Sequence, residues 1–182
     1  MENIYLRALE LSDLDRTWKW HNDSGLYQML VAPFRHVSRA AEEEWIRRKV
    51  AYSQTEFQLA ICLKENDQHI GNINLRNIDW VSRHAEVGIF IAEAEYWSKG
   101  YGQEAMRLLL RHAFDDLGLR RVWLTVFDDN LRAIRSYEKC GFVVEGKLRK
   151  HACKGGQFRD LLFMGICIDD PAYGTVNNTD SG

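Results

Sequence analysis

A glycine-containing loop between a strand and a helix constrains this chain more than any other feature. The loop, residues 96–102, follows a β-type run at residues 85–91 and precedes residues 105–117, whose apolar side chains recur with helical spacing. The first N–H groups of such a helix have no partner within it and favour an anion. The arrangement therefore predicts an anion site at the start of the helix, with a pyrophosphate as its natural occupant.

Two glycines and one lysine sharpen this prediction. Gly100 and Gly102 allow turns that side chains forbid and let a ligand approach the backbone, and Lys99 adds a positive charge. A tight turn without a ligand would use the same glycines. The loop also lacks the third glycine of the dinucleotide fingerprint and the Gly-Lys-Ser/Thr of a P-loop. The loop alone therefore leaves both interpretations open.

A second motif, at residues 130–142, reads Asn-Leu-Arg-Ala-Ile-Arg-Ser-Tyr-Glu-Lys-Cys-Gly-Phe. With the first loop, it resembles the GNAT superfamily of acyl-CoA-dependent N-acyltransferases. The second family motif, Asn-x-x-Ala-x-x-x-Tyr-x-Lys-x-Gly-Phe, is matched at every position. The family's cofactor motif, Gln/Arg-x-x-Gly-x-Gly/Ala, is matched by residues 97–102, except that Trp97 stands at the Gln/Arg position. The resemblance covers residues 3–168, and its motifs stand in the family's order.

The resemblance implies a fold and a domain organisation. We expect the α/β GNAT fold, a mixed, mostly antiparallel central sheet of about seven strands with helices on both faces. Residues 1–168 should form a single acetyltransferase domain, and the polar residues 169–182 a flexible C-terminal tail. The hairpin predicted around residues 154–160 resembles the branch that contains spermidine and ribosomal-protein N-terminal acetyltransferases.

Acetyl transfer to an amine requires a neutral amine, a stabilised carbonyl oxygen and a proton for the leaving thiolate. Tyr137 occupies the position that supplies this proton in many GNAT enzymes, although a half-buried core tyrosine would look the same. Glu86 resembles the strand carboxylate that acts as a base through water in several relatives; an ordinary salt bridge, with Arg83 or Arg76, is the equal alternative.

The remaining site residues are carried over from the resemblance as contacts to acetyl-CoA, the expected co-substrate. They lie on the strand, on the loop and on the second motif: Ile89, Phe90, Ile91, Trp97, Ser98, Lys99, Gly100, Tyr101, Gly102, Asn130, Ala133 and Lys139. The strand backbone should pair with the pantetheine arm as an added strand would. The histidines are scattered and suggest no metal site; among them only His84, near Glu86, is a candidate auxiliary base.

The N-terminal segment offers candidate acceptor residues. Residues 18–23 are unusually aromatic, which fits either helix packing or a wall of the substrate pocket. Ser12 and Ser38 are predicted N-caps, the second for a helix over residues 39–51 with Ala41, Trp45 and Ile46 facing inward. Residues 42–44 are all glutamate and fit a solvated first turn, or a field that attracts a cationic substrate.

The composition limits the classes of binding partner and the cellular compartment that we expect. The net charge of −2 argues against a broad nucleic-acid surface, and no apolar stretch reaches the length of roughly 18 residues that spans a membrane. The four cysteines lack Cys-x-x-Cys spacing, and two lie in apolar runs, as reduced core thiols do. We expect a cytoplasmic enzyme without nucleic-acid or membrane partners, with a small-molecule amine substrate and a homodimer as the candidate assembly.

The sequence thus predicts transfer of an acetyl group from acetyl-CoA to a primary amine, on a polyamine or an amino sugar. Tyr137 would be the general acid, and Glu86 a candidate water-mediated base. An N-terminal protein acetyltransferase and a non-catalytic acyl-CoA sensor are the alternatives.

Overall fold

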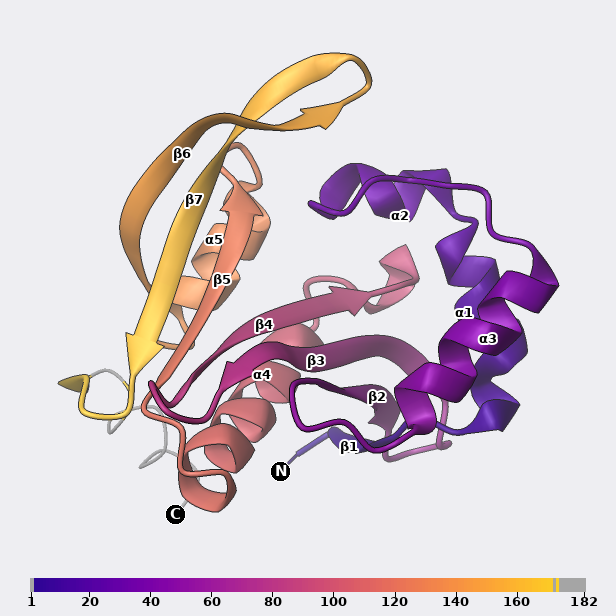
Figure 1. The fold of residues 1–182 in the computed structure, drawn as a ribbon, viewed down its shortest axis with the longest axis horizontal. Helices are drawn as coiled ribbons and strands as arrows, with labels where there is room; N and C mark the ends of the chain where they lie inside the picture. Colours follow the sequence, from indigo (N-terminus) through magenta and orange to yellow (C-terminus); the bar gives the residue numbers. More distant parts are fainter. Residues whose placement is uncertain (1, 172, 174–182) are drawn as a thin grey trace.

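The computed structural model describes residues 2–171 and 173 and contains one seven-stranded sheet in the order β1-β2-β3-β4-β5-β7-β6 (Figure 1). The strands are β1 (Ile4–Ala8), β2 (Phe57–Leu63), β3 (His69–Asp79), β4 (His84–Ile91), β5 (Arg121–Phe127), β6 (Val143–Lys154) and β7 (Gln157–Cys167). All neighbouring strands are antiparallel except β4 and β5. The predicted mixed, mostly antiparallel sheet is therefore confirmed.

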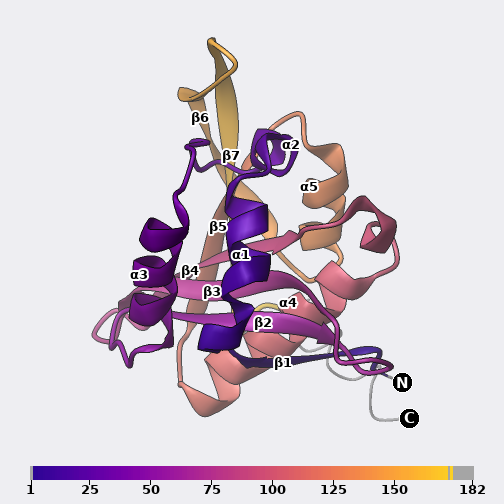
Figure 2. The ribbon, with the colours of Figure 1, turned by 90° about the vertical axis from the view of Figure 1, so that its right-hand side faces the viewer.

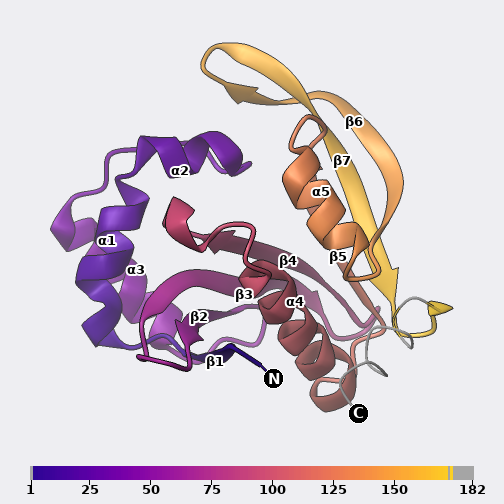
Figure 3. The ribbon, with the colours of Figure 1, turned by 180° about the vertical axis from the view of Figure 1, so that it is seen from behind.

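Helices cover both faces of this sheet. They are α1 (Leu14–His21), α2 (Ser24–Met29), α3 (Arg39–Val50), α4 (Tyr101–Arg111) and α5 (Leu131–Glu138). Figure 3 shows α4 and α5 on one face, and Figure 2 shows α1 and α3 side by side, with α2 beyond them near the β6–β7 hairpin. No helix in the described part of the chain is both long and apolar enough to cross a membrane.

The parallel pair formed by β4 and β5 is short. These parallel strands pair only at His84–Arg121, Ala85–Val122 and Glu86–Trp123. Beyond Glu86, β4 continues beside β3 while β5 stays paired with β7 along its whole length, so the two strands diverge (Figure 1). The edge of β4 that faces this gap has no neighbouring strand.

The two faces of strands β2–β4 differ in chemistry, because side chains alternate between the faces of a sheet. One face packs against α4 and forms the main core; Ile61, Ile73, Leu75, Val87, Met106 and Leu109 belong to it. The other face, below α1 and α3, carries polar side chains, including Gln58, Asn72 and Asn74. In β4, Val87, Ile89 and Ile91 pack on the core face, and Glu86 lies off it.

Several local predictions need correction. The first helical turn has Glu10, and not Ser12, at its N-cap, where the Asp13 side chain accepts from the Glu10 N–H at 3.0 Å. The central helix begins at Tyr101, and its last part, His112–Asp116, is a wider π-helical turn. In α3 the Ser38 cap is confirmed by its bond to the N–H of Ala41, but Ala41 itself is exposed. The predicted tail, residues 169–182, lies mostly outside the described residues.

A partly buried ion pair links β1 to the residue that precedes α1. The Arg7 guanidinium donates from both terminal nitrogens to Asp13, each at 2.7 Å, and His69 Nδ1 lies 3.3 Å from Asp13 Oδ1. Burial alone would raise the pKa of the Asp13 carboxyl, but the hydrogen bonds from Arg7, with His69 beside them, hold that pKa well below its usual range.

Asp13→Asn should lower the free energy of unfolding by about 2 kcal/mol at neutral pH, because hydrogen bonds to a charged group are lost. A carboxyl with a lowered native pKa stabilises the fold above the pKa of the unfolded chain, about 3.9, and this contribution disappears as the pH falls below it. The difference from wild type, measured by urea unfolding, should therefore shrink as the pH falls below about 4. Asp15→Asn is the control, because its ion-paired side chain is 74% exposed; an equal loss in both variants would contradict the assignment.

Candidate active site

The predicted anion loop has the backbone geometry of a ligand site. Gly100 adopts φ +90 and begins α4, whose Gln103 and Glu104 N–H groups both donate to the Gly100 carbonyl at 3.0 Å. The preceding N–H groups, of Tyr101 and Gly102, have no partner in the helix. A side-chain Cβ added at Gly102 would meet no atom within 4 Å, so the chain itself does not require a glycine there. An open space beside two free N–H groups suits a phosphate ligand.

Trp97, at the position where the resemblance expects Gln or Arg, has its own polar contact. Its indole Nε1–H donates to the Ile91 carbonyl at 2.9 Å, and the Arg132 guanidinium lies 4.2 Å from the ring centroid. One backbone acceptor of β4 that we expected to pair with pantetheine is therefore already occupied. Lys99 is exposed beside the ring of Tyr96 and does not line the cavity.

A cavity of about 1040 Å³ extends from this loop through the gap between β4 and β5 to the N-terminal helices. Tyr137, Glu86 and every cofactor residue predicted from the sequence except Lys99 line it. Residues far apart in the chain thus meet around one space, which is large enough for a substantial ligand. No group of three potential metal-binding side chains occurs among the residues that the structure describes.

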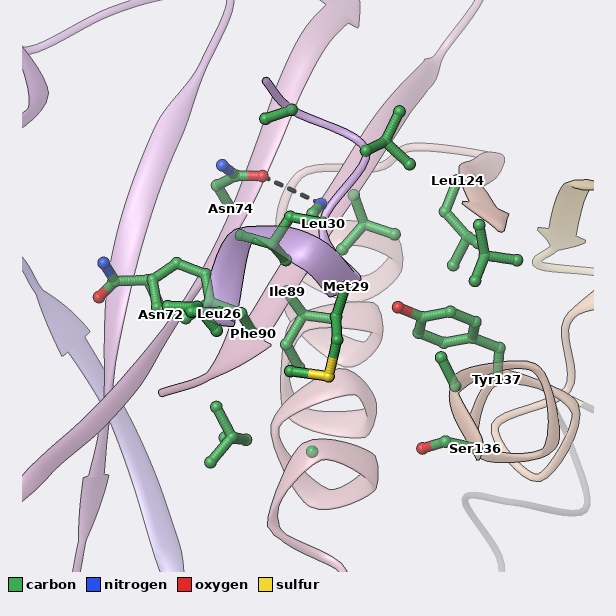
Figure 4. Close-up of a pocket in the computed structure, with 18 of the residues that line it drawn as sticks. Leu26, Met29, Leu30, Asn72, Asn74, Ile89, Phe90, Leu124, Ser136 and Tyr137 are labelled. Carbon is green, nitrogen blue, oxygen red and sulfur yellow. Dashed lines mark hydrogen bonds between the residues drawn. The ribbon is translucent and has the colours of Figure 1, made fainter. Parts of the chain in front are cut away.

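Helix α5 places Tyr137 in the wall of this cavity. The Asn130 side chain caps the helix by accepting from the Ala133 N–H at 3.2 Å. At the other end Gly141, with φ +95, closes a Schellman motif in which the N–H of Phe142 bonds to the Tyr137 carbonyl. The Tyr137 hydroxyl points from the helix into the cavity, toward the space beside Met29 and Ile89 (Figure 4).

The environment of Tyr137 keeps its phenol protonated. Burial raises the pKa of Tyr137 to about 12, because the phenolate would lose its hydration. A thiol like that of cysteine has a pKa of about 8.5, so a thiolate leaving group would be far less basic than this phenolate. The group can therefore donate a hydrogen bond to a developing thiolate at any physiological pH.

Glu86 lines the cavity but is not a free carboxylate. One of its oxygens accepts from the Arg76 guanidinium and the other from Asn77 Nδ2 at 2.9 Å, and the residue is 7% exposed. Of the two partners considered from the sequence, Arg76 is the one that forms the ion pair. His84, the other candidate base, lies 4.0 Å from Asp79 and does not line the cavity.

The end of the cavity near the N-terminal helices, called the acceptor end below, is lined on one side by polar side chains of the sheet and on the other by residues of those helices. The wall formed by the sheet is the polar face of β2–β4, with Gln58, Asn72 and Asn74. Asn72 is 2% exposed and its Nδ2 has no hydrogen-bond partner, although His69 Nε2 lies 2.7 Å from its Oδ1. Figure 4 shows Asn72 and Asn74 on the side of the cavity opposite Tyr137.

The wall formed by the N-terminal helices contains His21, which the sequence did not single out as a site residue. In the aromatic segment Trp18 and Trp20 have structural contacts: Trp18 Nε1 donates to the Val37 carbonyl at 2.8 Å and Trp20 is buried. His21, from the same segment, lines the cavity and contacts Glu42. The predicted solvated run of glutamates is thus wrong for Glu42, which is fully buried. Only helical position distinguishes Glu42 from its neighbours in the sequence.

Comparison with known proteins places this arrangement among acetyltransferases. Residues 3–143 match a family described as acetyltransferase (GNAT) domain. A spermidine N(1)-acetyltransferase of Vibrio cholerae is 35% identical over 164 residues, which cover 90% of this chain and 92% of the relative. A putative ribosomal N-acetyltransferase of Bacillus subtilis is 36% identical over 96 residues, covering 53% and 52% of the two chains.

The fold of this chain also resembles that of a solved acetyltransferase structure. The spermidine N-acetyltransferase of Vibrio cholerae, solved in complex with CoA and spermine, superposes with a TM-score of 0.86 at 26% identity. The match covers 93% of this chain and 98% of that one. The free N–H groups and the open space at Gly102 fit the pyrophosphate of such a cofactor, and the unpaired edge of β4 fits its pantetheine arm.

Gly102→Val should raise the Kd for acetyl-CoA at least about tenfold, or about 1.4 kcal/mol, because the new side chain would fill the space beside the free N–H groups. Calorimetric titration measures this change. Gly146→Val is the matched control, since a Cβ at Gly146 on β6 also meets no atom within 4 Å. Unchanged affinity in a folded Gly102→Val protein would show that the loop does not hold the cofactor.

Proposed function

Because the chain belongs to the GNAT family of N-acetyltransferases, we propose that it transfers the acetyl group of acetyl-CoA to the primary amine of a small molecule, a polyamine or an amino sugar. The observation that carries this proposal is the Tyr137 hydroxyl, which faces a cavity shared by the anion loop and the polar sheet face. Acetyl-CoA bound along β4 would bring its thioester into the gap between β4 and β5.

In the proposed reaction the amine attacks the thioester carbonyl directly. The backbone N–H groups along the free edge of β4 stabilise the oxygen as charge develops on it. Tyr137 gives its proton to the departing sulfur. Glu86 is a candidate base through a water molecule, although both of its oxygens already accept hydrogen bonds from Arg76 and Asn77.

A small acceptor suits the covered end of the cavity. Lys154, at the tip of the β6–β7 hairpin, donates through Nζ to the backbone carbonyls of Tyr27 and Ala32, both of which line the cavity. The hairpin is therefore fastened to the α2 segment at the acceptor end. A folded protein surface would have less access to the thioester than a small molecule, which disfavours a protein substrate.

The charges at this end favour an amino sugar over a polyamine. Two carboxylates line the cavity in the described part of the chain, and each is paired with a cation: Glu56 with Lys49 at 2.7 Å, and Glu86 with Arg76. A second ammonium group of a polyamine would find no free carboxylate among them. The polar groups of the wall formed by the sheet, with Gln58 and Asn74, can hydrogen-bond the hydroxyl groups of a sugar.

The direct test is release of free thiol from acetyl-CoA across polyamines, amino sugars, aminoglycosides and short peptides. We expect turnover with an amine of a small molecule, fastest with an amino sugar. Turnover restricted to peptides would favour a protein N-terminal acetyltransferase. Acetyl-CoA binding by calorimetry without turnover on any acceptor would favour a non-catalytic sensor.

Tyr137→Phe should lower kcat by about ten- to a thousandfold, as loss of a general acid does, with little change in the Kd for acetyl-CoA. Because the pKa of Tyr137 is raised to about 12, wild-type kcat should not fall through loss of the acid below about pH 10. Tyr52→Phe is the control, since Tyr52 is 90% exposed. A Tyr137→Phe enzyme with wild-type kcat would exclude Tyr137 as the proton donor.

A further inference from the structure

His21 and Glu42 form a hydrogen-bonded pair at the acceptor end of the cavity, and the proposed reaction does not yet use it. His21 is the last residue of α1, and Glu42 lies in the first turn of α3. Glu42 Oε2 lies 2.6 Å from His21 Nδ1, and the His21 side chain is 15% exposed. The pair thus joins a fully buried carboxylate to a ring that lines the cavity.

The contact with Glu42 determines which ring nitrogen is available. In the neutral tautomer that donates from Nδ1 to the Glu42 carboxylate, the ring proton lies on Nδ1 and Nε2 keeps its lone pair. Among the described residues nothing is hydrogen-bonded to Nε2. The ring is held from its sides by Trp45, with centroids 4.5 Å apart in an edge-on contact, and by Tyr27 at 6.4 Å. Nε2 is therefore a proton acceptor in a fixed orientation.

Glu42 is an expensive residue to bury for packing alone. It is 0% exposed, and its Oε1 has no hydrogen-bond partner. A buried carboxylate with one hydrogen bond costs stability that an apolar side chain would not. A buried Glu42 carboxylate has a function if it stabilises a positive charge that forms on the His21 ring. The helix dipole also favours an imidazolium at the C-terminal end of α1.

We infer that His21, oriented by Glu42, removes the proton from the ammonium group of the acceptor. The inference rests on the proposed function and assigns the base to His21 in place of Glu86, whose oxygens are already engaged by Arg76 and Asn77. His21 contacts the amine directly or through one water molecule, and Glu42 is a positioning residue.

The proton balance of the reaction is complete with these groups. The ammonium gives one proton to His21 Nε2, and the neutral amine forms a C–N bond to the thioester carbon. When the C–S bond breaks, Tyr137 gives its proton to the sulfur and recovers one from the new amide nitrogen, directly or through water. His21 later releases its proton to solvent, so the products are the amide, the free thiol and one proton.

The experiment compares two acceptors, because a base is needed only when the nucleophile is protonated. One is the most active alkylamine of the panel; the other is methoxyamine, which is largely unprotonated at neutral pH. His21→Gln should lower kcat for the alkylamine about a hundredfold or more, and change turnover of methoxyamine less than about threefold, with an unchanged Kd for acetyl-CoA. Glu42→Gln should show the same selective loss, and Glu42→Asp a partial recovery.

His112→Gln is the matched control. His112 Nδ1 lies 2.7 Å from Asp116 Oδ2 in a similar pair, but this pair is exposed and does not line the cavity. This variant should retain the turnover of wild type with both acceptors.

Four results would overturn the inference. Wild-type kcat in His21→Gln, or an equal loss with both acceptors, would leave His21 a structural residue. A selective loss in Glu86→Gln, and not in His21→Gln, would return the role of base to Glu86. If wild type releases no thiol with any acceptor, the proposed function itself fails and the assignment of His21 fails with it.

Discussion

The separation of β4 from β5 is the constraint on which the rest of the site depends. Three residue pairs hold the two parallel strands together, and then each follows its own antiparallel neighbour. A strand edge inside a protein must find partners for its N–H and C=O groups. Trp97 supplies one by donating to the Ile91 carbonyl. The remaining edge can pair with an extended ligand, and the helix that begins at Gly100 can hold its phosphates.

One face of strands β2–β4 contributes to stability, and the other lines the cavity. On the α4 face, Ile73 and Leu75 are fully buried in the core. On the opposite face, Asn72 and Asn74 lie one residue away along the same strand and line the cavity. Since adjacent residues of a strand point to opposite faces, one segment can build a dry core and a polar acceptor site together.

The carboxylates at the acceptor end have partners within the chain. Glu56 and Glu86 each have a cationic partner, whereas the hydrogen-bond partner of Glu42 in the described part of the chain is His21. An ion pair between a carboxylate and the ammonium of Lys49 or the guanidinium of Arg76 changes little when a proton is transferred nearby. A carboxylate that faces a neutral imidazole gains strongly when that ring becomes charged. This difference separates the structural carboxylates from the one that supports proton transfer.

The sequence by itself determined the glycine loop between a strand and a helix, the cap of α3 by Ser38 and the motif that contains Tyr137, because each depends on neighbours a few residues away. Only the tertiary structure decided that Lys99 lies outside the cavity, that Glu86 is paired with Arg76, and that His21 meets Glu42. The last two depend on strand register and on the packing of α1 against α3, which bring side chains together in ways that no local pattern records.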